Sequence, residues 1–164
     1  MKNNEIIIEH LNNILCAELF AVNNYLISSK LLKSRGIYKL SNQQRANSMD
    51  EMKHADAMMD RIIFLGGNPK CAFRDYSGQT DINIDKTTSI KTIIENDISS
   101  EMSAVEYISN AINEIENLGD KITSELLIGI LKDEDNHLQW LQEQLACINN
   151  IGLDLYIVYS QNND

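Results

Sequence analysis

The sequence predicts an all-α protein: a four-helix bundle with a long crossover between the second and third helices and a short fifth C-terminal helix. Three observations favour this fold class. Apolar residues recur at helical spacing over four long stretches. The 164 residues include one proline and seven glycines, which leaves room for long helices. A pattern of glutamate and histidine also repeats once at a fixed interval, as two copies of one helical hairpin would require.

The first hairpin is expected over about residues 4–66. Its first helix runs from residue 5 to about residue 33 and ends at Gly36, a typical C-terminal stop. Residues 41–44 (Ser-Asn-Gln-Gln) match a capping box, which predicts that the second helix begins there. The second helix should stop at residues 66–69 (Gly-Gly-Asn-Pro).

Residues 68–86 form a connection without sustained periodicity. Loops longer than about 12–15 residues are uncommon in compact domains, so this one requires an explanation. A helix of about 25 residues is nearly 40 Å long, and about 18 extended residues can span that length. The connection is therefore interpreted as a crossover between opposite ends of the bundle, with the third helix parallel to the second. A flexible lid is the alternative.

The second hairpin is expected over about residues 87–150. Its third helix should begin near residues 87–89 and end near Asn117, and Asp120 can cap the fourth helix after a tight turn. Residues 153–160 are apolar and aromatic and form about two helical turns, which are marginal alone and must dock. The whole chain, residues 1–164, is interpreted as one domain.

Charge and cysteine content exclude several function classes. The net charge of −10 and pI of about 4.7 argue against nucleic acid or an anionic membrane as a partner. No uncharged apolar run approaches the roughly 18 residues of a membrane span, and no signal peptide is indicated. The three cysteines form no Cys-x-x-Cys pair, so neither a disulfide framework nor a thiolate zinc site is expected. We expect a cytoplasmic protein.

The repeated pattern is Asp-Glu-x-x-His. It occurs at residues 50–54 and again at residues 133–137, so that Glu134 follows Glu51 by 83 positions. Two further glutamates, Glu18 and Glu101, are separated by the same 83 positions. Within each motif the glutamate and histidine are three residues apart and therefore share one helical face.

All these residues lie in phase with apolar positions on their helices, on faces that should point into the core. They are four carboxylates and two imidazoles: Glu18, Glu51, His54, Glu101, Glu134 and His137. Burying unpaired carboxylates costs several kcal/mol each, and no matching set of inward lysine or arginine is available. The pattern therefore predicts a buried site for two metal ions.

The types of ligand limit which metals the site is expected to bind. Carboxylates and imidazoles without thiolate suit iron or manganese, although zinc and cobalt also bind such sites. One glutamate from each of two helices, plus Glu-x-x-His from each of the other two, is the ligand pattern of di-iron carboxylate bundles.

Three stretches then resemble the bacterioferritin family: residues 17–25 (Ala-Glu-Leu-Phe-Ala-Val-Asn-Asn-Tyr), 50–56 (Asp-Glu-Met-Lys-His-Ala-Asp) and 130–141. The resemblance covers nearly the whole chain and implies a ferritin-like fold. It also implies a shell of 24 subunits, built from dimers, that oxidises Fe(II) with O2 or H2O2 and stores ferric mineral. The implied terminal ligands are Glu18, His54, Glu101 and His137, and the implied bridging ligands are Glu51 and Glu134.

The resemblance implies two further roles. Tyr25 would be a redox-active tyrosine beside the site, and Met52 would ligate a haem b shared between two subunits. A core tyrosine and a methionine-rich dimer face that includes Met49 are the alternatives. Two positions depart from the family pattern: Ala46 replaces a histidine of an inner-surface iron site that would include Asp50, and Arg45 replaces an aromatic residue beside the haem.

Asp50 and Asp133 are candidate partners for a histidine across the bundle, or else solvated side chains. His10 is expected to be solvated and Trp140 to be a packing residue. Three rival functions are compatible with such a bundle: a small dimeric di-iron peroxidase or oxidase without storage, a DNA-protecting mini-ferritin, and an inactive shell subunit. The net charge disfavours the second rival, and the complete set of ligands disfavours the third.

Overall fold

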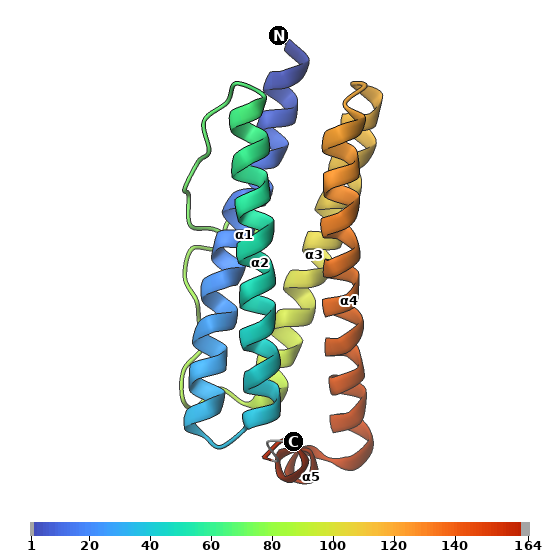
Figure 1. Ribbon diagram of the computed structural model, residues 1–164. Helices are drawn as coiled ribbons and strands as arrows, with labels where there is room; N and C mark the ends of the chain where they lie inside the picture. The colour runs from blue at the N-terminus through green and yellow to red at the C-terminus, as the bar shows by residue number, and fades with distance from the viewer. Residues whose placement is uncertain (1, 162–164) are drawn as a thin grey trace.

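A computed structural model describes residues 2–161, and within this range every regular element is an α-helix (Figure 1). The five helices are α1 (Lys2–Ser34), α2 (Tyr38–Phe64), α3 (Ile90–Asn117), α4 (Lys121–Ile151) and α5 (Leu153–Ser160). The first four form a bundle, and α5 lies across one end of it. The predicted all-α bundle with a short fifth helix is confirmed.

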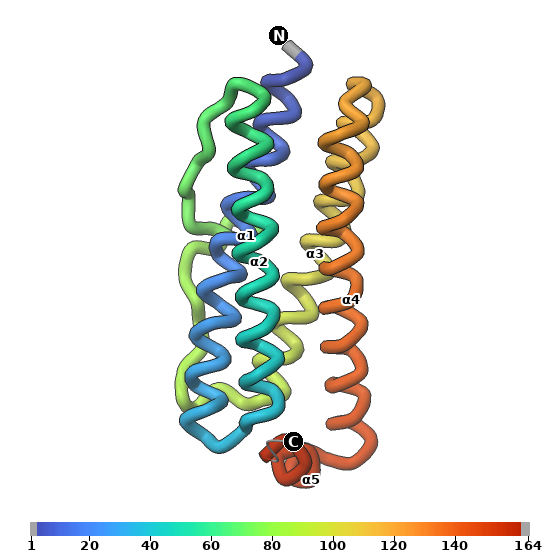
Figure 2. Tube along the Cα trace, viewed as in Figure 1, coloured from blue at the N-terminus to red at the C-terminus, as the bar shows by residue number. Residues whose placement is uncertain are grey.

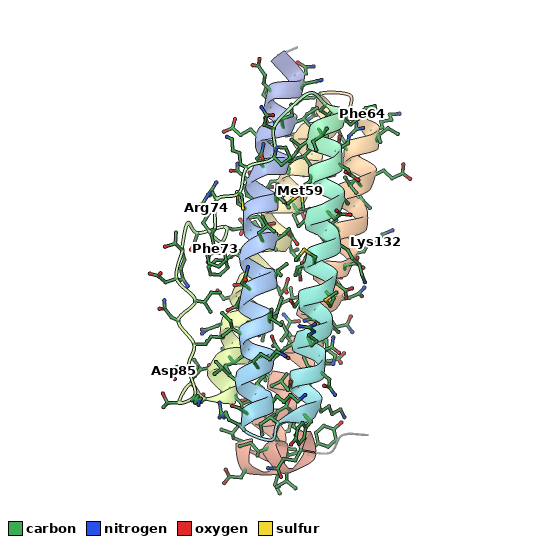
Figure 3. The ribbon with its side chains drawn as sticks, turned by 60° about the vertical axis from the view of Figure 1, so that its left-hand side comes forward. Met59, Phe64, Phe73, Arg74, Asp85 and Lys132 are labelled. Carbon is green, nitrogen blue, oxygen red and sulfur yellow. The ribbon has the colours of Figure 1, made fainter. Side chains whose placement is uncertain are left out.

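Neighbouring helices in each hairpin run antiparallel, α1 with α2 and α3 with α4 (Figure 2). After α2 the chain returns along the outside of the bundle to the end where α2 began, and α3 then runs parallel to α2. Residues 65–89 are therefore a crossover, as the length of this segment predicted. Phe73, Arg74 and Asp85 lie along the side of the bundle that this crossover covers (Figure 3).

The predicted start of α2 was wrong by three residues. α2 begins at Tyr38, and its N-cap residue, Ile37, makes no side-chain capping bond. Gly36, at φ 76°, reverses the chain so tightly that the buried Ile37 docks at once and the helix follows directly. Ser41 is thus already helical, and its hydroxyl donates to the carbonyl of Ser29 over 2.8 Å rather than capping α2.

The other predicted boundaries are confirmed within a few residues. Ser89 caps α3 by accepting a hydrogen bond from the Thr92 amide over 3.0 Å. Asp120 caps α4 through the Thr123 amide, also over 3.0 Å. The short α5 docks through Tyr156, which is buried and whose hydroxyl donates to Gln144 Oε1 over 3.0 Å.

Two apolar clusters occupy the two ends of the bundle. One contains Ile7, Leu11, Ile14, Leu15, Ala55, Met58, Ile62, Ala104, Ile108, Ala111, Ile112, Ile115, Leu127 and Ile130. The other lies near α5 and contains Leu32, Ile37, Leu40, Ile90, Ile93, Ile94, Leu141, Ile148 and Tyr156. The buried acidic side chains and the two buried histidines lie between them, and this middle section holds the candidate site. Among the helices of residues 2–161, none combines the length and the hydrophobicity of a membrane-spanning segment.

Candidate metal centre

The four long helices bring the six predicted ligands together in the middle of the bundle. α1 supplies Glu18, α3 supplies Glu101, and α2 and α4 each supply a glutamate and a histidine one turn apart. None of the six is more than 8% exposed. Four carboxylates and two imidazoles therefore converge in the core, although they come from stretches as much as 119 residues apart.

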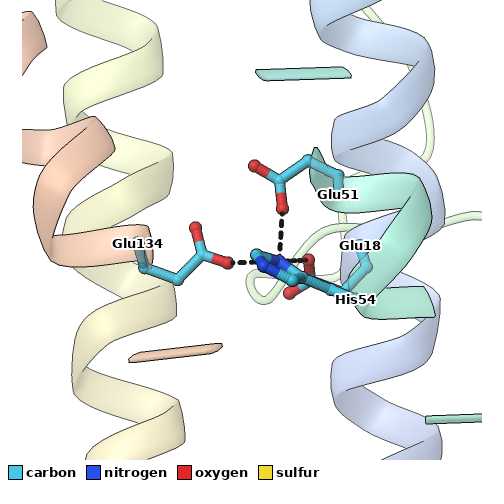
Figure 4. Close-up of side chains that lie close together, drawn as sticks. All are labelled: Glu18, Glu51, His54 and Glu134. Carbon is cyan, nitrogen blue, oxygen red and sulfur yellow. Dashed lines mark hydrogen bonds and ion pairs between the residues drawn. The ribbon is translucent and has the colours of Figure 1, made fainter. Parts of the chain in front are cut away.

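The six side chains form two overlapping groups, each with one potential ligand atom per residue within 4.8 Å of the others. The first group is Glu18, Glu51, His54 and Glu134 (Figure 4), and the second is Glu51, Glu101, Glu134 and His137. Glu51 and Glu134 belong to both groups. A carboxylate with two oxygens can face two ions at once, so this overlap is the arrangement that a two-metal site requires.

Within each group the histidine directs Nδ1 at the carboxylates. Nδ1 of His54 lies 3.1 Å from Glu51 Oε2, 3.1 Å from Glu134 Oε1 and 3.3 Å from Glu18 Oε2. Nδ1 of His137 lies 3.1 Å from Glu51 Oε1, 3.6 Å from Glu134 Oε2 and 3.7 Å from Glu101 Oε1. The same nitrogen of each ring thus faces the space that an ion would occupy.

The opposite ring nitrogens face the two aspartates that precede Glu51 and Glu134. Nε2 of His54 lies 3.1 Å from Oδ2 of Asp133, and Nε2 of His137 lies 3.9 Å from Oδ2 of Asp50. An ionised carboxylate can only accept hydrogen bonds, so Asp133 favours the tautomer of His54 that carries its hydrogen on Nε2. In a neutral ring of this tautomer the lone pair of Nδ1 is free to bind a metal ion. The interpretation of Asp133 as a partner across the bundle is thus supported by a contact.

Several buried atoms at the centre have no hydrogen-bond partner: Glu51 Oε1, Glu134 Oε1 and His137 Nδ1. They lie within contact distance of neighbouring groups but without hydrogen-bond alignment. No lysine or arginine is buried among the described residues, so no fixed cation compensates the four carboxylates. Unpartnered oxygens and a ring nitrogen around a buried, acidic space fit divalent metal ions of the kind that oxygen and nitrogen ligands select.

Without metal, protons take the place of cations. Burial and the charges of Glu134 and Glu51 raise the pKa of Glu18 well above its usual value. Burial also raises the pKa of Glu101 well above its usual value. Burial alone would lower the pKa of His137, but the carboxylates of Glu101, Glu134 and Glu51 around Nδ1 raise it to about 12.

The remaining two shifted groups at the centre follow the same logic. The pKa of His54 is raised because its bonds to Glu134, Glu18 and Glu51 outweigh burial. Burial alone would raise the pKa of Glu134, but its ion-pair contacts with His137 and His54 lower it to about 2. Glu134 is therefore the ionised partner of two charged imidazoles in the metal-free protein.

Two tyrosines flank the centre. Tyr25 is buried on α1 and donates a hydrogen bond to Glu101 Oε1, beside the site where the resemblance placed it. Tyr76 comes from the crossover, and its hydroxyl lies 3.4 Å from Glu18 Oε1. Burial and the nearby glutamates raise the pKa of both phenols well above the usual value, so both keep their protons. Tyr76 was not predicted, because the crossover has no periodicity to indicate which of its residues point inward.

Asp97 was also missed. It is 2% exposed and accepts hydrogen bonds from Gln44 Nε2 over 2.7 Å and from Asn24 Nδ2 over 3.1 Å. Burial raises its pKa to about 7. Its position one turn before Glu101, on the same face of α3, was a signal that could have identified it.

A cavity of about 320 Å³ leads from the surface to the centre. Its walls come from α1, α3 and crossover residues 75–84, and it reaches Glu18, Glu101, Glu51 and Glu134. Small ions and molecules therefore have a route to the buried carboxylates from the side that the crossover covers.

The other predicted residues lie away from the centre. Met52 and Met49 are 46% and 48% exposed on the outside of α2, where Arg45 and Ala46 are also exposed. The prediction that His10 is solvated was wrong: its side chain is 20% exposed, and Nε2 lies 3.0 Å from Glu114 Oε2. All three cysteines are free: Cys16 is buried, Cys147 is half-buried and Cys71 is exposed.

Comparisons with known proteins agree with this architecture. A family profile described as a ferritin-like domain matches residues 8–151. The chain is 32% identical over 157 residues to a bacterioferritin of Streptomyces coelicolor, covering 96% of this chain and 90% of the relative. It is 33% identical over 156 residues to a bacterioferritin of Brucella melitensis, with 95% and 92% covered. It is 31% identical over 153 residues to a bacterial ferritin of Neisseria meningitidis, with 93% and 94% covered.

Proposed function

Because the chain belongs to the ferritin-like family, and within that family to the bacterioferritins, we propose that it is an iron-storage subunit with ferroxidase activity. It oxidises Fe(II) to Fe(III) at the buried centre, with O2 or H2O2 as the oxidant. The ferric product becomes mineral inside a shell of 24 subunits built from dimers.

The observation that carries this proposal is that two ligand groups share Glu51 and Glu134. In the proposed assignment these two glutamates bridge a pair of iron ions. Glu18 and His54 complete the coordination of one ion, and Glu101 and His137 complete that of the other. Four carboxylates supply four negative charges, which balance two divalent ions when both histidines are neutral.

Iron supplies the redox chemistry, since each Fe(II) gives up one electron to the oxidant. The chain supplies the arrangement. Glu51 and Glu134 hold both ions within one buried space, so one oxidant molecule can take an electron from each of the two Fe(II) ions. Asp133 holds His54 with Nδ1 directed inward.

Two surface features support assembly. Leu155, Val158 and Tyr159 of α5 are 62%, 62% and 48% exposed, so the short helix presents apolar side chains outward. Met52 is exposed on α2, where a second subunit could supply a matching methionine for a shared haem b. Apolar side chains that a single subunit leaves in water are typical of contacts between copies.

An anaerobic Fe(II) titration combined with a native mass measurement tests the proposal. We expect a first binding phase that saturates at two irons per subunit and a mass near 24 subunits. Saturation near one iron contradicts the two-metal assignment. A dimer that oxidises iron without storing it indicates a di-iron oxidase or peroxidase, and retention on DNA at physiological salt indicates a DNA-protecting mini-ferritin.

A further inference from the structure

The crossover places one phenol directly on the metal centre. Tyr76 lies between α1 and α3, with its ring centroid 5.1 Å from that of Tyr107 on α3. Its hydroxyl is 3.4 Å from Glu18 Oε1, and it lines the cavity that leads to the centre. This is the contact that joins the crossover to one of the proposed metal ligands.

The segment around Tyr76 is built to hold this position. The Asp75 carboxylate accepts hydrogen bonds from the Ser77 amide over 2.9 Å and from the Gln79 amide over 2.8 Å. The Asp75 amide in turn donates to the Gln79 carbonyl, which closes the turn, and Gly78 adopts the φ of 88° that the turn requires. Tyr76 therefore sits in a closed turn and not in a loose loop.

The crossover is fixed to α1 on the N-terminal side of this turn. Arg74 donates to Asn13 Oδ1 over 2.7 Å, and Lys70 donates its amide to Asn12 Oδ1 over 2.6 Å. The Phe73 ring packs 5.0 Å from the Phe20 ring, measured between centroids. These contacts restrict how far Tyr76 can move from Glu18.

We propose that Tyr76 is a positioning residue of the metal centre, whose hydroxyl holds the Glu18 carboxylate in place for the ion bound by Glu18 and His54. The inference rests on the proposed two-metal function. The two oxygens of Glu18 are divided between two partners: Oε2 faces His54 Nδ1 at 3.3 Å, and Oε1 faces the phenol. A donor on Oε1 leaves Oε2 to bind the ion and fixes the rotation of the carboxylate.

In the other half of the centre a phenol also meets the glutamate of the single-ligand helix, since Tyr25 donates to Glu101; there the phenol bonds Oε1, the same oxygen that lies 3.7 Å from His137 Nδ1. The internal repeat does not supply the second tyrosine: the residue 83 positions after Tyr25 is Ile108, which is fully buried in the apolar core. The crossover supplies the phenol that the repeat lacks. The contact of 3.4 Å is long for O–H···O, as such contacts often are before the ligand is bound.

A Co(II) titration tests the role of Tyr76, because Co(II) reports coordination through its visible absorption without any turnover. The variant is Tyr76→Phe, which keeps the ring and removes the hydroxyl. The control is Tyr107→Phe, which removes the hydroxyl of the stacked partner; that hydroxyl accepts from Asn13 Nδ2 over 2.9 Å and faces His10, away from the carboxylates.

We expect the wild-type protein to bind two Co(II) per subunit, and Tyr107→Phe to bind each of the two ions as tightly as the wild-type protein does. In Tyr76→Phe one of the two ions should bind about tenfold or more weakly, as loss of a group that orients a ligand usually causes, while the other binds normally. In a Glu18→Ala background, Tyr76→Phe should have no further effect.

Three results overturn the inference. Unchanged affinity for both ions in Tyr76→Phe would show that the hydroxyl does not position the Glu18 carboxylate. Equal weakening of both ions, or a further loss in the Glu18→Ala background, means that Tyr76 acts on the fold and not through Glu18. A wild-type protein that binds fewer than two Co(II) at the centre contradicts the proposed function itself, and so is distinguished from failure of the Tyr76 inference alone.

Discussion

Nε2 of His54 and Oδ2 of Asp133 lie 3.1 Å apart, so a histidine of the first hairpin is oriented by an aspartate of the second. The matching pair, His137 and Asp50, is 3.9 Å apart, and Asp50 instead forms an ion pair with Lys53 at 2.7 Å. The two halves of the centre share a ligand pattern but differ in how firmly each histidine is held.

Asp133→Asn should therefore weaken metal binding more than Asp50→Asn does. An amide oxygen is an uncharged and weaker acceptor than a carboxylate oxygen, so the ring of His54 is held less firmly. We expect Co(II) affinity at one of the two positions to fall about tenfold in Asp133→Asn, and by less in Asp50→Asn. Asp135→Asn, an exposed change on the same helix, is the control. Equal effects of all three substitutions contradict this asymmetry.

Glu134 and Glu18 should affect the stability of the metal-free protein in opposite directions. Glu134 is ionised and contacts both histidines, so Glu134→Gln leaves two charged imidazoles short of a partner. Breaking such a buried pair typically costs about 3–5 kcal/mol. Glu18→Gln instead removes a carboxyl whose charge burial disfavours, so the metal-free protein should be at least as stable as wild type.

Chemical unfolding of metal-free protein at pH 7 measures this difference. Glu143→Gln, on an exposed position of α4, is the control. Similar losses of unfolding free energy in Glu134→Gln and Glu18→Gln would show that the carboxylates do not differ in charge state. Both substitutions should still impair metal binding, since each removes a proposed ligand.

The sequence predicted most of the fold because the relevant signals are local. Helical spacing, Gly36, Ser89 and Asp120 each mark a boundary within a few residues of where it lies. Ser41 misled the prediction because the same residue types that cap helices also hydrogen-bond to a neighbouring helix, and only the packed structure distinguishes the two uses.

The candidate site was predictable for a different reason. Polar residues in phase with a core face are informative because burial without a partner is so unfavourable, and the interval of 83 residues linked the two halves. Tyr76 could not be found this way. Its contact with Glu18 depends on the path of a segment without periodicity, fixed by tertiary contacts such as that of Arg74 with Asn13.

Metal binding should release protons. In the metal-free protein the pKa values of His54 and His137 are raised far enough that both rings hold an extra proton at pH 7, and burial raises the pKa of Glu18 and Glu101 toward their protonated forms. Ligands bind metal in their deprotonated forms, so loading both ions should release the two histidine protons and any held by the two glutamates, and affinity should fall as pH falls. Calorimetry in buffers of different ionisation enthalpy counts these protons, and affinity independent of pH contradicts the prediction.

Met52→Leu should abolish haem binding if the resemblance applies to this chain. Met52 would supply a thioether ligand to the haem iron, with its counterpart from a second subunit, and leucine cannot coordinate iron. The protein reconstituted with haem should show a Soret band that Met52→Leu loses and Met49→Leu keeps. A Soret band that persists in Met52→Leu, or that is absent from the wild-type protein, contradicts the assignment of Met52 as a haem ligand.

Asp97 should make the metal-free protein less stable as the pH rises from about 4 to 7. Burial raises its pKa from the ordinary 3.8 to about 7, so in this range the folded state binds more protons than the unfolded state. Unfolding then releases a proton, and a higher pH favours unfolding. Over about three pH units this one group removes at most about 4 kcal/mol of unfolding free energy.

The substitution Asp97→Asn eliminates that contribution and keeps an acceptor for Gln44, so the unfolding free energy of the variant should vary less with pH than that of the wild-type protein. Urea unfolding at pH 5, 6 and 7 measures the slopes, with Glu106→Gln on the exposed face of α3 as the control. A slope in Asp97→Asn as steep as that of wild type would assign the pH dependence to the glutamates of the centre, whose raised pKa values act in the same direction.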